Sequence, residues 1–191
     1  MSDILHYTLT DFITSYGVRI PSLRLYYQCF GLPLGEAPVV VVNHAFTGNS
    51  QVTGENGWWK EAIGEGKLID TLKYTVVAFN IPGNGFGARE EDMIPNYEHW
   101  AGIDIARIFN QGLTEHLGLK EVFALVGCSL GGGIAWEMAA LAPTLFKELV
   151  IVAADWKATD WIIGNCLLQE QILKNSTHPL HDARLHAMLC Y

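Results

Sequence analysis

Four short runs of almost wholly apolar residues constrain the fold of this chain more than any other feature. Half-exposed strands alternate apolar with polar residues, whereas strands buried on both faces, as in parallel sheets, are apolar throughout. An earlier segment, residues 23–30, alternates more clearly and is predicted to be an antiparallel edge strand. The runs that we expect to form a buried parallel sheet are residues 39–42, 74–79, 122–126 and 149–152.

Helical patterns lie between and after these runs. Residues 103–117 place an apolar side chain at every third or fourth position, and Gly118 follows as a stop signal. Strands that alternate with helices in this way predict an α/β fold with right-handed crossovers. We expect a sheet domain over residues 1–160 and helices over residues 161–191. The remaining helical patterns cover residues 134–141, 161–173 and 182–191.

Composition excludes several classes of protein. Apolar residues make up 50% of the 191 positions, which excludes an intrinsically disordered chain. The 20 acidic residues outnumber the 12 basic ones, and the net charge of −8 argues against binding to nucleic acid. No apolar run approaches the roughly 20 residues of a membrane helix, and the N-terminus does not resemble a signal peptide. Four cysteines without a CxxC pair fit a reduced, cytoplasmic protein.

The strongest chemical signal is a Gly-x-Ser-x-Gly motif at residues 127–131, between the third apolar run and a helical pattern. This context is typical of a nucleophile elbow, a turn that holds a serine hydroxyl beside a helix N-terminus, where negative charge is favoured. The turn strains the backbone, so the positions two residues away on either side must lack a Cβ atom. Ser129 is therefore the predicted nucleophile, and the alternative is that it only caps the helix.

Residues 43–48, which follow the first apolar run, are predicted to complete an oxyanion hole. In enzymes with this turn, one backbone N–H belongs to the residue after the nucleophile, here Leu130, and the other to the loop after this strand. We assign the second N–H to Phe46, with Thr47 as the neighbouring possibility. His44 precedes the nucleophile in the chain, so we favour a structural role for it over that of a base.

No catalytic base is assigned within the chain. Only one strand follows Ser129, and the adjacent His181 and Asp182 are expected to point apart on a helix. The histidines of this region lack an HExxH motif, so no metal site is predicted. The other downstream candidates for acid or base are Asp155, Asp160, His178 and His186.

Two further segments allow more than one interpretation. The glycines of residues 81–87 resemble a phosphate-binding loop only superficially, since no GxxxxGK[ST] motif is present. We expect this segment to be an active-site loop at the end of a strand. Trp58 and Trp59 either line a ligand channel or belong to the core.

Several blocks, in order along the chain, resemble those of one known family. They include a His-Ala-Phe-Thr-Gly sequence similar to that family's His-Ala-Leu-Thr-Gly signature, and they extend from about residue 20 to the end of the chain. The family is that of the homoserine O-acetyltransferases. The blocks are residues 44–50, 57–71, 127–132, 161–173 and 183–191.

The resemblance implies an α/β-hydrolase fold with a mainly parallel sheet, whose C-terminal strands lie outside this chain and whose helical lid begins in residues 161–191. It also implies a ping-pong transfer in methionine biosynthesis. Ser129 would take the acetyl group of acetyl-CoA and pass it to the hydroxyl of L-homoserine. Acetyl-CoA would be a co-substrate, with no bound cofactor.

The resemblance further assigns Arg184 and Tyr191 to the homoserine carboxylate, since a planar guanidinium suits a carboxylate. The alternatives are an ion pair of Arg184 with Asp182 or Glu170, and a core position for Tyr191. A homodimer formed through the lid helices is also implied.

Three departures from the family pattern leave the acyl donor, acetyl or succinyl, and the acceptor open. The first is Cys128 and Leu130, where the family usually has Gly and Met, and the second is the loop at residues 81–87, which lacks the family's usual Gly-Gly-Cys-x-Gly-Ser-Thr-Gly-Pro sequence. The third is the segment at residues 174–181, which is shorter than the family's corresponding stretch. The competing functions are a serine esterase of the same fold, in which water resolves the acyl-enzyme, and an inactive fragment or binding module. We expect this chain alone not to turn over. A separate C-terminal polypeptide, a truncation and a natural short product all stay open as explanations.

Overall fold

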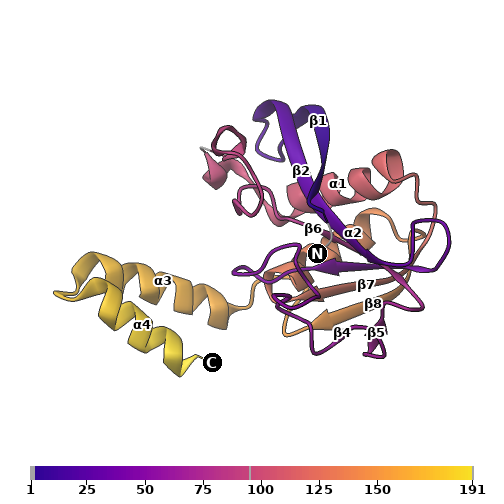
Figure 1. The fold of residues 1–191 in the computed structure, drawn as a ribbon. Coiled ribbons are helices and arrows are strands. Elements are labelled where there is room, and N and C mark those ends of the chain that lie inside the picture. The colour runs from indigo at the N-terminus through magenta and orange to yellow at the C-terminus, as the bar shows by residue number, and fades with distance from the viewer. Residues whose placement is uncertain (1–2, 95, 191) are drawn as a thin grey trace. The chain divides into compact units, whose positions relative to one another are not determined.

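The computed structural model describes residues 3–94 and 96–190, and the chain divides into two compact units (Figure 1). The first unit is Met1–Trp156 and the second is Lys157–Tyr191. Tyr191, which was assigned to substrate binding, lies outside the described residues.

The first unit is built on a six-stranded sheet with the order β1-β2-β6-β3-β7-β8. The four strands from β6 to β8 run parallel to one another, and β1 and β2 join them as an antiparallel pair. The predicted α/β fold with a mainly parallel sheet is confirmed. The strands are β1 (Leu5–Ile13), β2 (Arg19–Gly31), β3 (Val39–Asn43), β6 (Thr75–Phe79), β7 (Val122–Cys128) and β8 (Phe146–Val152).

Two predictions about the strands are wrong. The segment predicted as an edge strand belongs to β2, which lies between β1 and β6, so β1 forms that edge of the sheet. Strand β8 is not buried on both faces. Its Leu149 and Ile151 pack against the core, whereas Val150 and Val152 are 45% and 39% exposed.

The two faces of the sheet carry separate apolar clusters, because side chains alternate along each strand. One face includes Val41, Val77 and Leu125, and it is covered by helices α1 (Gly102–Gln111) and α2 (Leu130–Leu141). A π-helical turn (Gly112–His116) continues α1 and is followed by Gly118, which has a φ of 66°.

The opposite face includes Val40, Val42 and Val126, against which Trp58 and Trp59 pack. The two indoles stack with ring centroids 4.8 Å apart, so they belong to the core rather than to a ligand channel. The same loop region carries two short strands that pair with each other, β4 (Ile63–Gly64) and β5 (Ile69–Asp70).

The second unit is a hairpin of two helices, α3 (Asp160–Asn175) and α4 (Pro179–Leu189). Thr159 caps α3 by accepting a hydrogen bond from the Ile162 N–H. Helix α4 begins three residues before the predicted start, because Pro179 occupies its first turn, where a missing N–H costs nothing. Among the described residues of this unit, only Ala183 is buried.

Across residues 3–94 and 96–190, none of the helices combines the length and the apolar character needed to cross a membrane.

Candidate active site

Ser129 lies at the turn between β7 and α2, with φ 52° and ψ −122°. A positive φ is uncommon for a residue with a side chain and marks local strain. Backbone hydrogen bonds hold the turn in this conformation. The Ser129 N–H donates to the Val152 carbonyl at 2.9 Å, and the N–H groups of Gly132 and Gly133 donate to the Ser129 carbonyl. The geometry is that expected of a nucleophile elbow, while the nucleophilic role of Ser129 stays a prediction.

The glycines around Ser129 are required by close backbone contacts. A Cβ atom on Gly127 would lie 2.4 Å from the Gly131 carbonyl oxygen. A Cβ atom on Gly131 would lie 2.4 Å from the His44 carbonyl oxygen and 2.5 Å from that of Asn43. These distances are far below van der Waals contact. Glycine at 127 therefore lets α2 begin directly after the end of β7, and glycine at 131 lets α2 begin beside the end of β3. The expectation that these positions lack a Cβ atom is thereby explained.

The close approach at Gly131 brings the start of α2 next to the loop that contains Phe46. Phe46 is 79% exposed and Leu130 is 38% exposed. Neither backbone N–H donates a hydrogen bond to another residue in the described part of the chain. Two unpaired donors beside the Ser129 turn are what an oxyanion hole needs. Their role, and the choice between Phe46 and Thr47, stay predictions.

His44 braces this loop from inside the protein. It is 1% exposed, its Nδ1 contacts the Ala45 carbonyl at 2.7 Å, and its Nε2 accepts a hydrogen bond from the Ile81 N–H at 3.0 Å. Burial lowers the pKa of His44, so the ring is neutral, with its proton on Nδ1. Both ring nitrogens are occupied, which agrees with the predicted structural role.

Two asparagines, which the sequence analysis did not identify, tie the Phe46 loop to the loop after β6. Asn80 accepts a hydrogen bond from the Ser50 N–H at 2.7 Å and donates to the Phe86 carbonyl. Asn84 donates to the Gly48 carbonyl at 3.0 Å and accepts from the Phe86 N–H. Asn80 is a polar residue directly after an apolar strand run, and this position could have identified it as a candidate site residue.

A cleft of about 610 Å³ opens between these two loops and the start of α1. We name it the Trp100 cleft. Phe46 and Leu130, the predicted oxyanion donors, both line it, and so does the segment Ile81–Asn84, as expected of an active-site loop at a strand end. The other described lining residues are Thr47, Gly48, Tyr97, Trp100, Ala101, Gly102 and Ile105.

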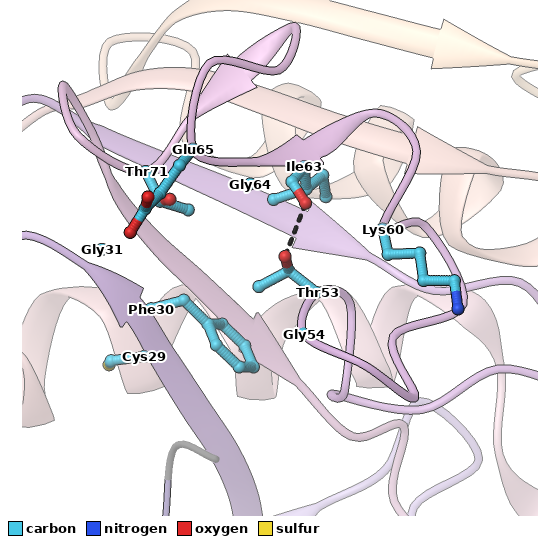
Figure 2. Close-up of a pocket in the computed structure, with 10 residues that line it drawn as sticks. All are labelled: Cys29, Phe30, Gly31, Thr53, Gly54, Lys60, Ile63, Gly64, Glu65 and Thr71. Carbon is cyan, nitrogen blue, oxygen red and sulfur yellow. Dashed lines mark hydrogen bonds between the residues drawn. The ribbon is translucent and has the colours of Figure 1, made fainter.

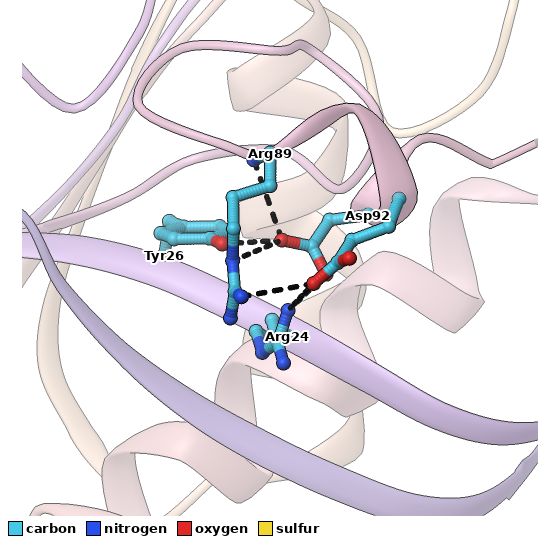
Figure 3. A network of polar contacts seen from close by, with 5 residues as sticks. Arg24, Tyr26, Arg89 and Asp92 are labelled. Atoms are coloured by element: carbon cyan, nitrogen blue, oxygen red, sulfur yellow. Dashed lines mark hydrogen bonds and ion pairs between the residues drawn. The ribbon is translucent and has the colours of Figure 1, made fainter.

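A cluster of charged side chains holds residues 89–92, in the segment that follows β6, against β2 (Figure 3). The Arg24 guanidinium of β2 donates to Asp92 at 2.7 Å and to Glu91 at 3.0 Å, and the Tyr26 hydroxyl donates to the other Asp92 oxygen. Burial works to raise the pKa of the Asp92 carboxyl, but the hydrogen bonds from Tyr26 and from the Arg89 N–H, together with Arg24, lower it overall. The short 3-10 helix Glu90–Asp92 is thus held against β2.

A second pocket, of about 530 Å³, contains none of the predicted site residues (Figure 2). It is lined by Phe30 and Gly31 at the end of β2, and Gly31 pairs with Thr75, the first residue of β6. This end of the sheet is opposite to the carboxyl ends of the parallel strands, where Ser129 lies. Burial raises the pKa of the Cys29 thiol in this pocket to about 11, so the thiol is protonated and a poor nucleophile near neutral pH.

The remaining predicted site residue, Arg184, belongs to α4 in the second unit, where it is exposed. It forms no ion pair within the described residues. The alternative partners are engaged elsewhere: Glu170 pairs with Lys174, and Asp182 accepts from Ser176. The expectation that His181 and Asp182 point apart is wrong, since Nδ1 and Oδ1 are 2.9 Å apart. Ser176 fixes one Asp182 oxygen, and the other faces the exposed His181 ring in the first turn of α4.

The described residues contain no group of three or more His, Cys, Asp or Glu side chains arranged to hold a metal ion.

A serine in a strained strand-to-helix turn, beside two free N–H groups and at the carboxyl end of a parallel sheet, defines the class of protein. The sequence matches the alpha/beta hydrolase fold family over residues 38–170, and the chain belongs to this family. The predicted resemblance to the homoserine O-acetyltransferases is also confirmed by individual relatives.

The homoserine O-acetyltransferase of Cyclobacterium marinum is 32% identical over 196 residues, which cover 92% of this chain and 55% of that protein. That of Corynebacterium diphtheriae is 30% identical over 168 residues, which cover 84% of this chain and 45% of that protein. The chain therefore spans about half the length of the curated relatives it matches.

Solved structures of proteins with the same fold also resemble this chain. The homoserine O-acetyltransferase of Staphylococcus aureus superposes with a TM-score of 0.82 and 27% identity, over 99% of this chain and 58% of that one. Esterase E22, as its L374D mutant, superposes with a TM-score of 0.77 and 20% identity, over 93% of this chain and 54% of that one. The second likeness concerns the fold alone.

Proposed function

We propose that this chain carries the nucleophile and the oxyanion hole of a homoserine O-acetyltransferase. The observation that supports this most directly is Ser129 at a φ of 52°, between β7 and α2, beside the unpaired N–H groups of Phe46 and Leu130. The similarity to homoserine O-acetyltransferases favours acetyl-CoA as donor and the hydroxyl of L-homoserine as acceptor.

In the proposed reaction, the Ser129 oxygen attacks the thioester carbonyl while a base takes its proton. The resulting oxyanion accepts hydrogen bonds from Phe46 and Leu130, and losing one such donor raises the barrier by about 3–4 kcal/mol in related enzymes. The carbon–sulfur bond then breaks, and coenzyme A leaves with a proton. The homoserine hydroxyl attacks the acetyl-serine in the second half of the reaction and regenerates the free serine.

We propose that the base and its acid partner come from a polypeptide outside these 191 residues. His44 is excluded as the base because both of its ring nitrogens are engaged. Without that polypeptide the chain should not turn over. Its proposed cellular location is the cytoplasm, where acetyl-CoA and a reduced set of cysteines are both expected.

For the homoserine carboxylate we propose Arg184, together with Tyr191. Arg184 is exposed and forms no ion pair in the described part of the chain, so its guanidinium is available for a ligand. Tyr191 lies outside the described residues, and its part in the proposal comes from the family resemblance.

We also propose a homodimer formed through the second unit. Its helices expose large apolar side chains, among them Trp161 at 62%, Leu167 at 56% and Leu180 at 79%. Analytical ultracentrifugation of the chain and of Leu167→Asp tests this. A dimer that the substitution dissociates supports the proposal, and a monomeric wild-type chain contradicts it.

The deciding experiment follows acetyl groups on Ser129. The tagged chain is incubated with radiolabelled acetyl-CoA in lysate of its source cells, which supplies any partner polypeptide, and the Ser129 peptide is analysed by mass spectrometry. We expect acetyl-Ser129 that L-homoserine discharges as O-acetylhomoserine, and no labelled peptide from Ser129→Ala. Rapid release of acetate without homoserine favours the esterase, and absence of label at Ser129 favours a binding module.

A further inference from the structure

The middle of the Phe46 loop is not held in place by its own hydrogen bonds. Phe46 is 79% exposed, and neither Phe46 nor Thr47 takes part in a backbone hydrogen bond within the described part of the chain. The Gly48 N–H donates to the Ala45 carbonyl at 2.9 Å and closes the turn around them. An oxyanion donor lowers the barrier only if it is in position before the charge develops. The position of the Phe46 N–H must therefore be set where the loop is anchored.

One anchor of this loop is the buried ring of His44, and the other is Ser50, four residues after Phe46. Ser50 is 0% exposed. Its N–H donates to Asn80 Oδ1 at 2.7 Å, directly after β6, and its hydroxyl donates to Gln28 Oε1 at 2.8 Å, in β2. The backbone and the side chain of Ser50 are thus held from two different strands of the sheet.

The second anchor belongs to a buried polar network. Gln28 and Asn80 are 1% and 3% exposed. The Gln28 amide donates to Gln51 Oε1 at 3.3 Å, and the Gln51 amide donates to the Thr53 carbonyl at 2.7 Å. A buried network whose members have partners holds one arrangement, and water does not readily replace a partner that is lost there. Breaking this network should therefore displace the loop.

We infer that Ser50, held by β2 and β6, is a positioning residue that fixes the Phe46 N–H for an oxyanion formed at Ser129. The inference rests on the proposed acyl transfer, for which it assigns the group that preorganises one oxyanion donor. The other donor, Leu130, is the first residue of α2 and is positioned by that helix. Loss of the Ser50 anchor should therefore disorder one donor and leave the other in place.

Four variants separate this role from a general effect on stability. Asn80→Ala leaves the Ser50 N–H without its acceptor, and Ser50→Ala removes only the bond of the hydroxyl. Asn80→Asp is the conservative variant, because a carboxyl oxygen accepts from the Ser50 N–H whether or not the group is protonated. Asn110→Ala is the matched control. Asn110 of α1 donates to the Met138 carbonyl of α2 at 3.0 Å and has no hydrogen bond to the Phe46 loop.

Nuclear magnetic relaxation of the backbone amides measures the positioning in the chain itself, without substrate or partner polypeptide. For the Phe46 N–H we expect an order parameter of about 0.85 in the wild-type chain and in Asn80→Asp, and below about 0.6 in Asn80→Ala. Ser50→Ala should give an intermediate value. Leu130 should stay ordered in every variant, and Phe46 should stay ordered in Asn110→Ala.

The rate of acetyl-Ser129 formation, measured in lysate of the source cells at several concentrations of acetyl-CoA, is the second readout. A displaced donor should lower the maximal rate by about 100-fold in Asn80→Ala and about tenfold in Ser50→Ala. The acetyl-CoA concentration that gives half the maximal rate should not change, because the Phe46 N–H acts on the transition state rather than on the bound thioester. Asn80→Asp should recover most of the rate, and Asn110→Ala should keep it.

A Phe46 N–H that stays ordered in folded Asn80→Ala, or a wild-type labelling rate in that variant, would overturn the inference. Equal disorder in Asn80→Asp or in Asn110→Ala would overturn it as well. If Asn80→Ala does not fold, Ser50→Ala decides, and a Phe46 N–H as ordered as in the wild-type chain then overturns the inference. Its failure is distinguishable from failure of the proposed function. An unlabelled wild-type Ser129 contradicts the function, whereas the relaxation data test the position of Phe46 without any reaction.

Discussion

The two units of this chain use their apolar residues differently. In the first unit, leucines, valines and isoleucines fill two clusters, one on each face of the sheet, and many of these side chains are fully buried. In the second unit, helices α3 and α4 are also rich in apolar residues, but only Ala183 is buried among the described ones. A substitution should therefore cost free energy of unfolding in the first unit and little in the second.

The largest contrast is expected from adding a methyl group to a glycine in each unit. Gly131→Ala places a Cβ atom 2.4 Å from a backbone oxygen of His44, so it should destabilise the first unit by about 4 kcal/mol or more. Gly164→Ala in α3 meets nothing within 4 Å and should stabilise that helix by about 0.5–1 kcal/mol.

Urea unfolding, followed by near-ultraviolet and far-ultraviolet circular dichroism, measures both effects. A loss smaller than 1 kcal/mol for Gly131→Ala would show that the end of β3 can move away from α2. The Ser129 turn would then not depend on this close approach.

Truncating one leucine in each unit gives the next largest contrast. Leu125 in β7 is 0% exposed, so Leu125→Ala should cost about 2–5 kcal/mol, because it leaves a cavity in the core. Leu167 in α3 is 56% exposed, and Leu167→Ala should change stability by no more than about 0.5 kcal/mol.

Thermal unfolding at several protein concentrations separates two outcomes for Leu167→Ala. A large cost that disappears on dilution means that this side chain is buried between two copies of the chain. A large cost at every concentration contradicts the contrast between the units, since Leu167 would then be buried within one chain.

The sequence predicted those features of the first unit that depend on neighbouring residues. The apolar runs of β3, β6, β7 and β8 and the glycines around Ser129 follow local rules, because burial and turn geometry act over a few positions. The helices of both units were likewise predicted from their periodicity and stop signals.

Features that depend on distant residues were missed. Strand β1, not β2, is at the edge, and this was not predicted because it depends on which strands pair. Asn80 contacts Ser50, 30 positions away, and Asn84 contacts Gly48, 36 positions away. The Trp100 cleft combines three such segments, so its size and lining could not be inferred before the loops were placed.

A third contrast compares two aspartates. Asp104 at the start of α1 is 0% exposed and accepts hydrogen bonds from the Ser15 N–H, the Ser15 hydroxyl and the Ala101 N–H. Asp104→Ala leaves these donors without partners and should cost about 2–3 kcal/mol. Asp182 in the second unit accepts a hydrogen bond from the Ser176 hydroxyl, but its side chain is 42% exposed. In Asp182→Ala, water can therefore accept the hydrogen bond from Ser176 in place of the lost carboxylate.

Guanidinium unfolding of the two variants provides the comparison. We expect a clear shift of the midpoint for Asp104→Ala and none beyond error for Asp182→Ala. Equal shifts would mean that solvent exposure does not set the cost of losing these hydrogen bonds.

The smallest effect is a pH dependence that arises from burial of one histidine in the first unit. His44 is 1% exposed, whereas the side chain of His181 in the second unit is 70% exposed. Burial lowers the pKa of His44 in the folded chain below the ordinary value of 6.5, which applies to the unfolded chain. At a pH between the folded and the unfolded pKa, His44 therefore takes up a proton only in the unfolded chain. The contribution of His44 to stability is thus constant above pH 6.5 and falls as the pH decreases toward the folded pKa.

The difference in unfolding free energy between the wild-type chain and His44→Gln isolates this contribution, because the other six of the seven histidines are present in both. The difference should be constant from pH 8 to about pH 6.5 and then shrink by up to about 1.4 kcal/mol per pH unit. A difference that is independent of pH would mean that His44 takes up a proton equally in both states. That result would contradict the assignment of a neutral His44 ring that accepts a hydrogen bond from the Ile81 N–H. It would also contradict the structural role of His44 beneath the Phe46 loop.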